Sequence, residues 1–404
     1  MRICSWFVSA TAALLLASSL RAGASEPVLP RQYVGAGSCS ASGCHNANFT
    51  HGVKGSEFTA WMTRDPHGRA YEGLFGERAR HIQQKMRSNR AAHEERRCLL
   101  CHVAPEYDAI KSPAYFVTDG VSCESCHGPA KQWLPIHHLD AWKSKSPAEK
   151  ATFGMADTRT LPGRAQMCAR CHVGAGGMDV DHDLVAAGHP RLYFEFAAFH
   201  AHMPHHWKDA EYSEVQAWGA GQLATTDATL KLLADRAKAG PWPEFALQDC
   251  ASCHHNLDGR ADRTSKRKPG AFAIGPLGAA LDLVPHLTPG QSDLHDALLN
   301  LRQSLDRNAP RQQIFAHADV ASRLLIPGML PKTLDEAAIA RALRGYTLGD
   351  GATYRSLMLA SLHDRIGGVE RDDALAALRL HAFDPEAIRR RLTDLKSRPK
   401  RGTP

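Results

Sequence analysis

Five pairs of cysteines, each followed directly by a histidine, constrain this chain more than any other feature of its sequence. The first pair, Cys39 and Cys44 before His45, has four residues between its cysteines. The other four have the spacing C-x-x-C-H and consist of Cys98, Cys101, His102; Cys123, Cys126, His127; Cys168, Cys171, His172; and Cys250, Cys253, His254. Any fold for this chain has to accommodate five copies of one small binding motif.

The spacing C-x-x-C-H is the attachment signature of c-type haem. The two thiols form thioether bonds to the porphyrin, and the adjacent imidazole becomes the proximal iron ligand. A three-residue step places both sulfurs on one side of a helical turn, from which the histidine reaches the iron. Zinc ribbons need no histidine after each pair, and disulfides between cysteines three apart are strained. We therefore predict five covalently attached haem c groups, the variant motif included, where Gly43 should ease the longer loop.

Residues 1–24 have the pattern of a secretory signal peptide. Met1-Arg2 precedes an apolar run, and Ala22-Gly23-Ala24 forms a cleavage site of small residues. We expect export to the periplasm and loss of Cys4 with the cleaved peptide. An uncleaved N-terminal anchor is the alternative, because the apolar run is about 18 residues long.

The density of motifs limits the fold. All five lie within residues 39–254, which is too little chain to surround each porphyrin with its own apolar core. The haems must therefore pack against one another, and closely packed macrocycles conduct electrons. We predict a mainly α-helical, loop-rich multihaem cytochrome c with stacked haems and a C-terminal helical region.

Apolar residues at helical spacing place two of the expected helices. One lies between Trp218 and Lys238, and another presents a face of Leu294, Leu298, Leu301 and Leu305. The predicted organisation is a signal peptide at 1–24, a pentahaem domain at 25–257, a basic linker at 258–276 and a helical domain at 277–404.

Histidines outside the motifs are candidates for the second axial position of each iron. Of these 18 histidines, 13 lie between His51 and His255, and imidazole is a natural axial ligand of haem iron. For any single one, a solvated or hydrogen-bonded side chain is the alternative, but so large an excess favours ligation. Their contexts select His67, one of His137 and His138, His182, His189, and one of His200, His202, His205 and His206.

Longer segments surround several motifs. Asp119 to Pro129 encloses the third motif and is followed by His137, while Trp61 and His67 follow the first motif. These segments resemble the cytochrome c-554 family of multihaem cytochromes. The runs His182 to Leu192 and Trp242 to Phe245 look like those of larger exported relatives, so the resemblance covers about residues 35–257.

The resemblance implies stacked haem pairs, bis-histidine irons and periplasmic electron transfer. By position it implies His67 and His137 as distal ligands, and His182, His189 and His206 as the remaining ones. This chain departs from the family's four-haem pattern in having five motifs and an added C-terminal region.

Three classes of function fit the sequence. We favour an electron carrier between periplasmic redox partners, because histidines are plentiful enough to fill every axial site. The second class is an oxidoreductase with one open haem that acts on a small nitrogen compound of the hydroxylamine, nitric oxide or nitrite type. The third is a subunit whose C-terminal region docks on a membrane complex while the haems relay electrons.

The basic composition does not indicate nucleic-acid binding. The net charge is +7, and loss of residues 1–24 removes two arginines and no acid, which leaves +5. Each ferric haem with ionised propionates contributes about −1 and each ferrous haem about −2, so the loaded protein is near 0 oxidised and about −5 reduced. The basic tail at 389–401 either docks an acidic partner or membrane surface, or is a solvated helix end.

Overall fold

The structure is a computed structural model, and it describes residues 31–47, 54–104, 111–192, 194, 196–204, 206, 214–247 and 284–326. Several predicted features lie outside these residues. They are the signal peptide 1–24, the fifth motif with Cys250, Cys253 and His254, the linker 258–276 and the basic tail 389–401. Predictions for those segments stay predictions.

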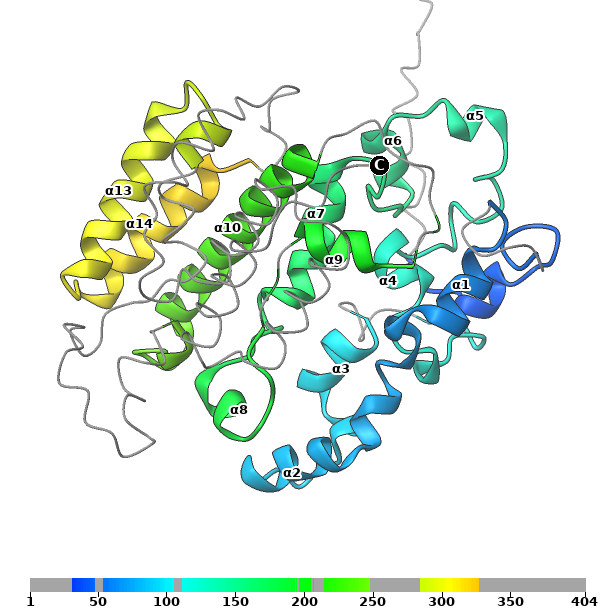
Figure 1. Cartoon of the computed structure of the whole chain (residues 1–404), viewed down its shortest axis with the longest axis horizontal. Helices are drawn as coiled ribbons and strands as arrows, with labels where there is room; N and C mark the ends of the chain where they lie inside the picture. Colours follow the sequence, from blue (N-terminus) through cyan, green and yellow to red (C-terminus); the bar gives the residue numbers. More distant parts are fainter. Residues whose placement is uncertain are drawn as a thin grey trace, which may run out of the picture. The chain divides into compact units, whose positions relative to one another are not determined.

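Helices dominate the described residues, which confirms the predicted mainly α-helical, loop-rich fold (Figure 1). Extended structure in these residues is limited to two isolated bridges. None of the described helices is long and apolar enough to cross a bilayer. The α-helices are α1 (Glu57–Arg64), α2 (Glu77–Lys85), α3 (Arg96–His102), α4 (Cys123–His127), α5 (Asp140–Lys143), α6 (Pro147–Thr152), α7 (Leu161–His172), α8 (His182–Ala186), α9 (Phe196–His202), α10 (Glu214–Ala239), α13 (Ser292–Asp306) and α14 (Arg311–Leu324).

Side-chain caps begin several of the short helices. The Oγ of Ser146 accepts a hydrogen bond from the backbone of Glu149, whose carboxylate accepts one from the backbone of Ser146, so α6 starts with a capping box. Thr160 caps α7, and Asp181 caps α8. Such helices are too short to be stable alone, so their ends are defined by caps and by packing.

Helix α10 is the predicted helix before the fifth motif, and it is longer than expected. It packs against α7 on one side and α14 on another (Figure 1). Toward α7 the contact is made of small side chains, which let the two helix backbones approach closely. These are Ala165 and Ala169 of α7 with Ala217, Ala220 and Ala224 of α10.

The hairpin of α13 and α14 completes a core with α10. All four leucines of the predicted face are buried, and they pack in one cluster with Trp218, Leu230 and Leu233 of α10. Arg311 at the start of α14 donates hydrogen bonds to the carbonyl oxygens of Arg236 and Gly240, at 3.2 and 2.9 Å. Carbonyls at a helix end lack intrahelical partners, so this arginine caps α10. The described C-terminal helices thus share a core with α10, and the division between 257 and 277 stays a prediction.

Candidate haem sites

Each described C-x-x-C-H motif lies on a helix that ends at the histidine of that motif. Helix α3 ends at His102, α4 at His127 and α7 at His172. The two cysteines of each motif therefore lie on one side of the final turn, and the imidazole leaves at the helix end. This is the local geometry that thioether attachment with proximal ligation requires.

The first motif is built differently. Cys39 ends a 3₁₀ helix, η1 (Ala36–Cys39), and Cys44 lies in the turn that follows. The backbone N–H of Cys44 donates to the carbonyl of Ala41 at 2.9 Å. Gly43 does not have a positive φ. The turn at Gly43 therefore uses a conformation open to any residue, and the predicted easing by glycine does not come from a left-handed backbone.

Cysteines from different motifs lie next to each other. Cys39 hydrogen bonds with Cys123, and Cys101 hydrogen bonds with Cys171. Burial raises the pKa of Cys126 to about 12, with the thiol of Cys168 close enough to raise it further. Burial thus keeps the thiol of Cys126 protonated at neutral pH, unlike the thiolates of zinc sites and redox-active pairs. The four described motifs form one cluster, as haems in mutual contact require.

Two proximal histidines face a predicted distal ligand directly. The ring centroids of His45 and His137 are 6.1 Å apart, and those of His67 and His172 are 6.0 Å apart. An iron with two axial imidazoles separates the ring centroids by about 6 Å, because each metal–nitrogen bond is about 2 Å long and each centroid lies roughly 1 Å further out. Both centroid separations match the value for two imidazoles on one iron.

Two more proximal histidines have a predicted distal histidine in their surroundings. Burial and the nearby imidazoles of His206 and then His45 lower the pKa of His127 to about 4. Burial lowers the pKa of His189, and the nearby His102 lowers it further. The lowered pKa values of His127 and His189 favour neutral imidazole, which is the form that binds a metal. The four described proximal histidines therefore each have one predicted distal histidine close by.

The ring nitrogens of these histidines are oriented for metal binding. In six of them Nδ1 donates to a protein oxygen, so Nε2 is the nitrogen able to coordinate iron. A hydrogen bond from the other ring nitrogen is the usual arrangement of metal-ligating histidines, and the residues therefore fit an iron at each pair. The acceptors are Glu57 for His45 (3.0 Å), Asp65 for His67 (2.8 Å), and the carbonyls of Ala70 for His102 (2.8 Å), Leu134 for His137 (2.6 Å), Pro190 for His189 (2.7 Å) and Pro204 for His206 (3.0 Å).

The structure also separates candidates that the sequence left open. His137 faces His45, whereas its neighbour His138 is exposed. In the cluster of four, His206 lies near His127, while Nε2 of His200 accepts a hydrogen bond from Arg164 at 2.9 Å. The side chains of His202 and His205 are outside the described part of the chain.

His182 is the one remaining distal candidate. It is the first residue of α8, and its ring centroid lies 5.6 Å from that of Phe245. Phe245 precedes the fifth motif closely in the chain, but Cys250, Cys253 and His254 are not described. The assignment of His182 to that motif stays a prediction.

Several side chains around these imidazoles were not singled out from the sequence. His172 packs against the rings of Phe194 and Phe199, whose centroids lie 5.2 Å from its own and from each other. Asp65 caps the 3₁₀ turn η2 (Pro66–Arg69) and holds His67 at the same time. The order Asp-Pro-His is a signal for such a cap and could have identified it. No local sequence pattern of this kind identifies Glu57 as the hydrogen-bond partner of His45.

Helix-ending C-x-x-C-H motifs with facing imidazoles are the features of c-type cytochromes. Residues 39–128 match the family model described as cytochrome c554 and c-prime, which confirms the predicted resemblance for this segment. The segment contains the first three motifs and His67. The match indicates a c-type cytochrome with covalently bound haem c and an electron-transfer or related redox role. No curated protein and no solved structure matches the chain.

Proposed function

We propose that the protein is a periplasmic multihaem c-type cytochrome that passes electrons between redox partner proteins through five covalently bound haems. The observation that carries this proposal is the closeness of a second imidazole to each described proximal histidine. The pairs are His45 with His137, His102 with His189, His127 with His206, and His172 with His67. An iron between two imidazoles has no open face for a substrate, so electron exchange is the chemistry left to it.

The chain's own residues would hold and orient the haems. The cysteine pairs would anchor each macrocycle, and the paired imidazoles would supply both axial ligands. A bound haem supplies a one-electron iron couple. The neighbouring thiols Cys39 and Cys123, and likewise Cys101 and Cys171, support haems that lie within contact of one another.

The alternative enzyme would need an iron with only one protein ligand. Among the described residues, each of the four proximal histidines has a second imidazole nearby. Arg164 donates a hydrogen bond to Nε2 of His200, so this nitrogen is already occupied and does not serve as an acid–base group at an open haem. These contacts favour the carrier over the oxidoreductase.

Carbon monoxide tests the proposal because it binds reduced haem iron only at an open or labile position. We expect the reduced wild-type protein to bind none, and the oxidised protein to give only low-spin ferric signals in electron paramagnetic resonance. A stoichiometric high-spin signal together with carbon monoxide binding would support the oxidoreductase instead. Mass spectrometry of the mature protein should find one haem for each of the five motifs.

Export and partner binding are part of the same proposal. Residues 1–24 support export, and haem staining of cell fractions should find the mature protein in the periplasm. Docking on a membrane complex is best tested by removing only residues 389–404. A larger deletion would take away α13 and α14, whose leucines share a core with α10. Unchanged capture of redox partners would show that the tail is a solvated end.

A further inference from the structure

The segment around α8 carries two predicted distal ligands on very little structure. His182 begins α8, and His189 follows it after Gly188, whose φ is 112°. The helix has five residues, and its apolar contacts are a small cluster of Leu184 and Ala187 with Ile82. A helix this short has little stability of its own, so polar contacts must fix where its histidines lie.

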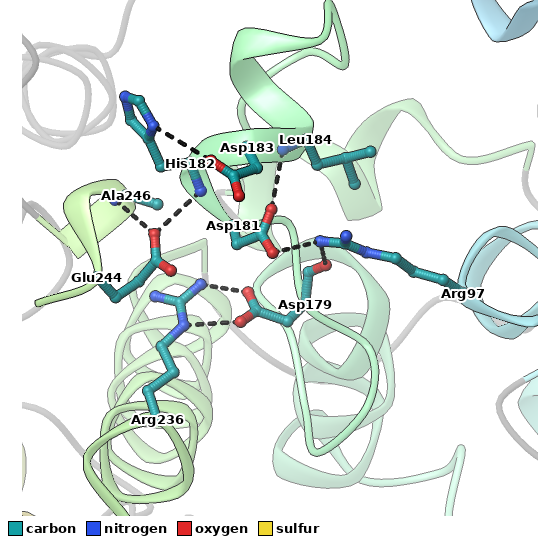
Figure 2. Close-up of polar contacts among 9 residues, drawn as sticks. All are labelled: Arg97, Asp179, Asp181, His182, Asp183, Leu184, Arg236, Glu244 and Ala246. Carbon is teal, nitrogen blue, oxygen red and sulfur yellow. Dashed lines mark hydrogen bonds and ion pairs between the residues drawn. The ribbon is translucent and has the colours of Figure 1, made fainter. Parts of the chain in front are cut away.

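The first polar contact ties this segment to α10 (Figure 2). Arg236 donates from Nε to one carboxylate oxygen of Asp179 at 2.7 Å, and from Nη2 to the other. The side chain of Arg236 is only 8% exposed. Removing the carboxylate would leave a buried guanidinium without its partner, which is costly. Asp179 is therefore held firmly on α10.

The second contact ties the segment to the helix of the second motif. Asp181 caps α8 by accepting from the backbone of Leu184 at 2.8 Å, and its other oxygen accepts from Arg97 at 2.8 Å. Arg97 also donates to the carbonyl of Asp179 at 3.2 Å. Arg97 lies beside Cys98 on α3, and α3 ends at His102. The segment that carries His189 is thus tied to the helix that ends at His102.

The third contact ties α8 to the chain that leads into the fifth motif. Glu244 accepts from the backbone N–H of His182 at 2.9 Å and from that of Ala246 at 2.8 Å. Glu244 is 6% exposed, so these bonds are shielded from water. The next residue, Phe245, contacts the ring of His182. Figure 2 shows the carboxylates of Asp181 and Glu244 at the backbone of α8, and that of Asp179 paired with Arg236 of α10.

We propose that Asp179, Asp181 and Glu244 are positioning residues for one haem, that of the second motif. They hold the backbone of this segment so that His189 can ligate the iron of that motif. The contacts of Arg97 with Asp181 and with the carbonyl of Asp179 join the segment that carries the distal ligand to α3, which ends at the proximal His102. This inference rests on the proposed function and adds to it the residues that set one of its ligands.

Two variants at Asp181 separate its two contacts. Asp181→Ala removes both the cap and the ion pair with Arg97, whereas Asp181→Asn keeps an oxygen that can cap α8. In the reduced holoprotein, we expect Asp181→Ala to bind carbon monoxide at about one iron per chain. Asp181→Asn should bind less, and the oxidised Asp181→Ala protein should gain a high-spin ferric signal.

Glu244 offers the same comparison from the N-terminal end of α8. Glu244→Gln keeps an acceptor oxygen for both N–H groups and should behave as wild type. Glu244→Ala should bind carbon monoxide at the same iron, so combined with Asp181→Ala it should still open about one iron per chain. Asp140→Ala is the matched control, since Asp140 is 97% exposed and pairs with Lys143 on α5.

Haem content measured by mass spectrometry accompanies every variant. If Asp181→Ala and Glu244→Ala keep all their haems and bind no carbon monoxide, the positioning role is wrong while the proposed carrier stands. If the wild-type protein itself binds carbon monoxide or lacks haems, the proposed function is wrong, whatever the variants do. If Asp181→Ala does not accumulate, Arg97→Ala removes the same ion pair from the side of α3, and Arg97→Lys keeps a cation there. Carbon monoxide binding by Arg97→Ala alone supports the positioning role, and no binding by either variant contradicts it.

Discussion

The histidines proposed as axial ligands differ in what their Nδ1 atom contacts. His45 and His67 donate to the carboxylates of Glu57 and Asp65, whereas His102, His137, His189 and His206 donate to main-chain carbonyls. Burial would raise the pKa of Asp65, but the hydrogen bond from the imidazole of His67 opposes it, and the net effect lowers that pKa. The carboxylate is therefore ionised at neutral pH. It makes the imidazole a stronger donor, which favours ferric iron.

Replacing Asp65 should change one haem potential selectively. Asp65→Asn keeps an oxygen for Nδ1 of His67 and removes the negative charge. We expect the midpoint potential of one haem, that of the fourth motif, to rise by an amount on the order of tens of millivolts. Spectroelectrochemical titration measures it, and Asp140→Asn on the exposed side of α5 is the control. A titration curve identical to that of wild type would contradict the pairing of His67 with His172.

A glycine directly after the third motif is required by the backbone. Gly128 has a φ of 81°, and a Cβ there would overlap the carbonyl oxygen of Gly154. We expect Gly128→Ala to destabilise the fold by at least about 1–3 kcal/mol. Gly73→Ala is the matched control, because no atom lies within 4 Å of the position its Cβ would take. Thermal unfolding of the two holoproteins compares them, and equal midpoints would refute the requirement.

At the scale of elements, α10 connects the motif-bearing helices with the C-terminal hairpin. Small residues face α7, and large apolar residues face α13 and α14. Arg311 closes the carbonyl end of α10, from which the chain continues toward the fifth motif. The C-terminal helices therefore stabilise a helix that belongs to the haem-bearing part.

Two leucines on α13 test this dependence. Leu301 is fully buried in the core shared with α10, while Leu299 on the same helix is 53% exposed. Leu301→Ala should lower the free energy of unfolding by about 2–5 kcal/mol, and Leu299→Ala should leave it nearly unchanged. Thermal unfolding followed by far-ultraviolet circular dichroism measures both. Similar losses for the two variants would mean that the hairpin does not pack on α10.

Elements with a local signal could be predicted from the sequence. The spacing of cysteine and histidine predicted the proximal motifs, and apolar periodicity predicted α10 and the buried face of α13. The choice between His137 and His138, or among the four histidines from His200 to His206, could not be made. The choice depends on which histidine lies close to a motif that is remote in the sequence. The hydrogen bond from Arg164 to His200 is also a contact between remote residues, so the sequence does not reveal it.

For the whole molecule, the haems should reverse the apparent basicity of the chain. Without the predicted signal peptide 1–24 the polypeptide would carry +5, and the five predicted haems with ionised propionates would bring the total near 0 when oxidised and to about −5 when reduced. Reduction should therefore move the protein toward the anode in native electrophoresis at pH 7. The same gel run on oxidised protein is the reference. A mobility that does not depend on oxidation state would mean that fewer haems are redox-active than the motifs predict.

The pairing of imidazoles across the chain has a consequence for how the protein is made. His45 faces His137, which comes after the third motif, and His172 faces His67, which comes before the second. Attachment to cysteines can proceed motif by motif on an extended chain, but each of these irons keeps a single imidazole until a remote segment docks. Long-range contacts form late in folding. The change from high-spin to low-spin iron should therefore mark the completion of folding, and an incompletely folded chain would carry exposed, reactive haem.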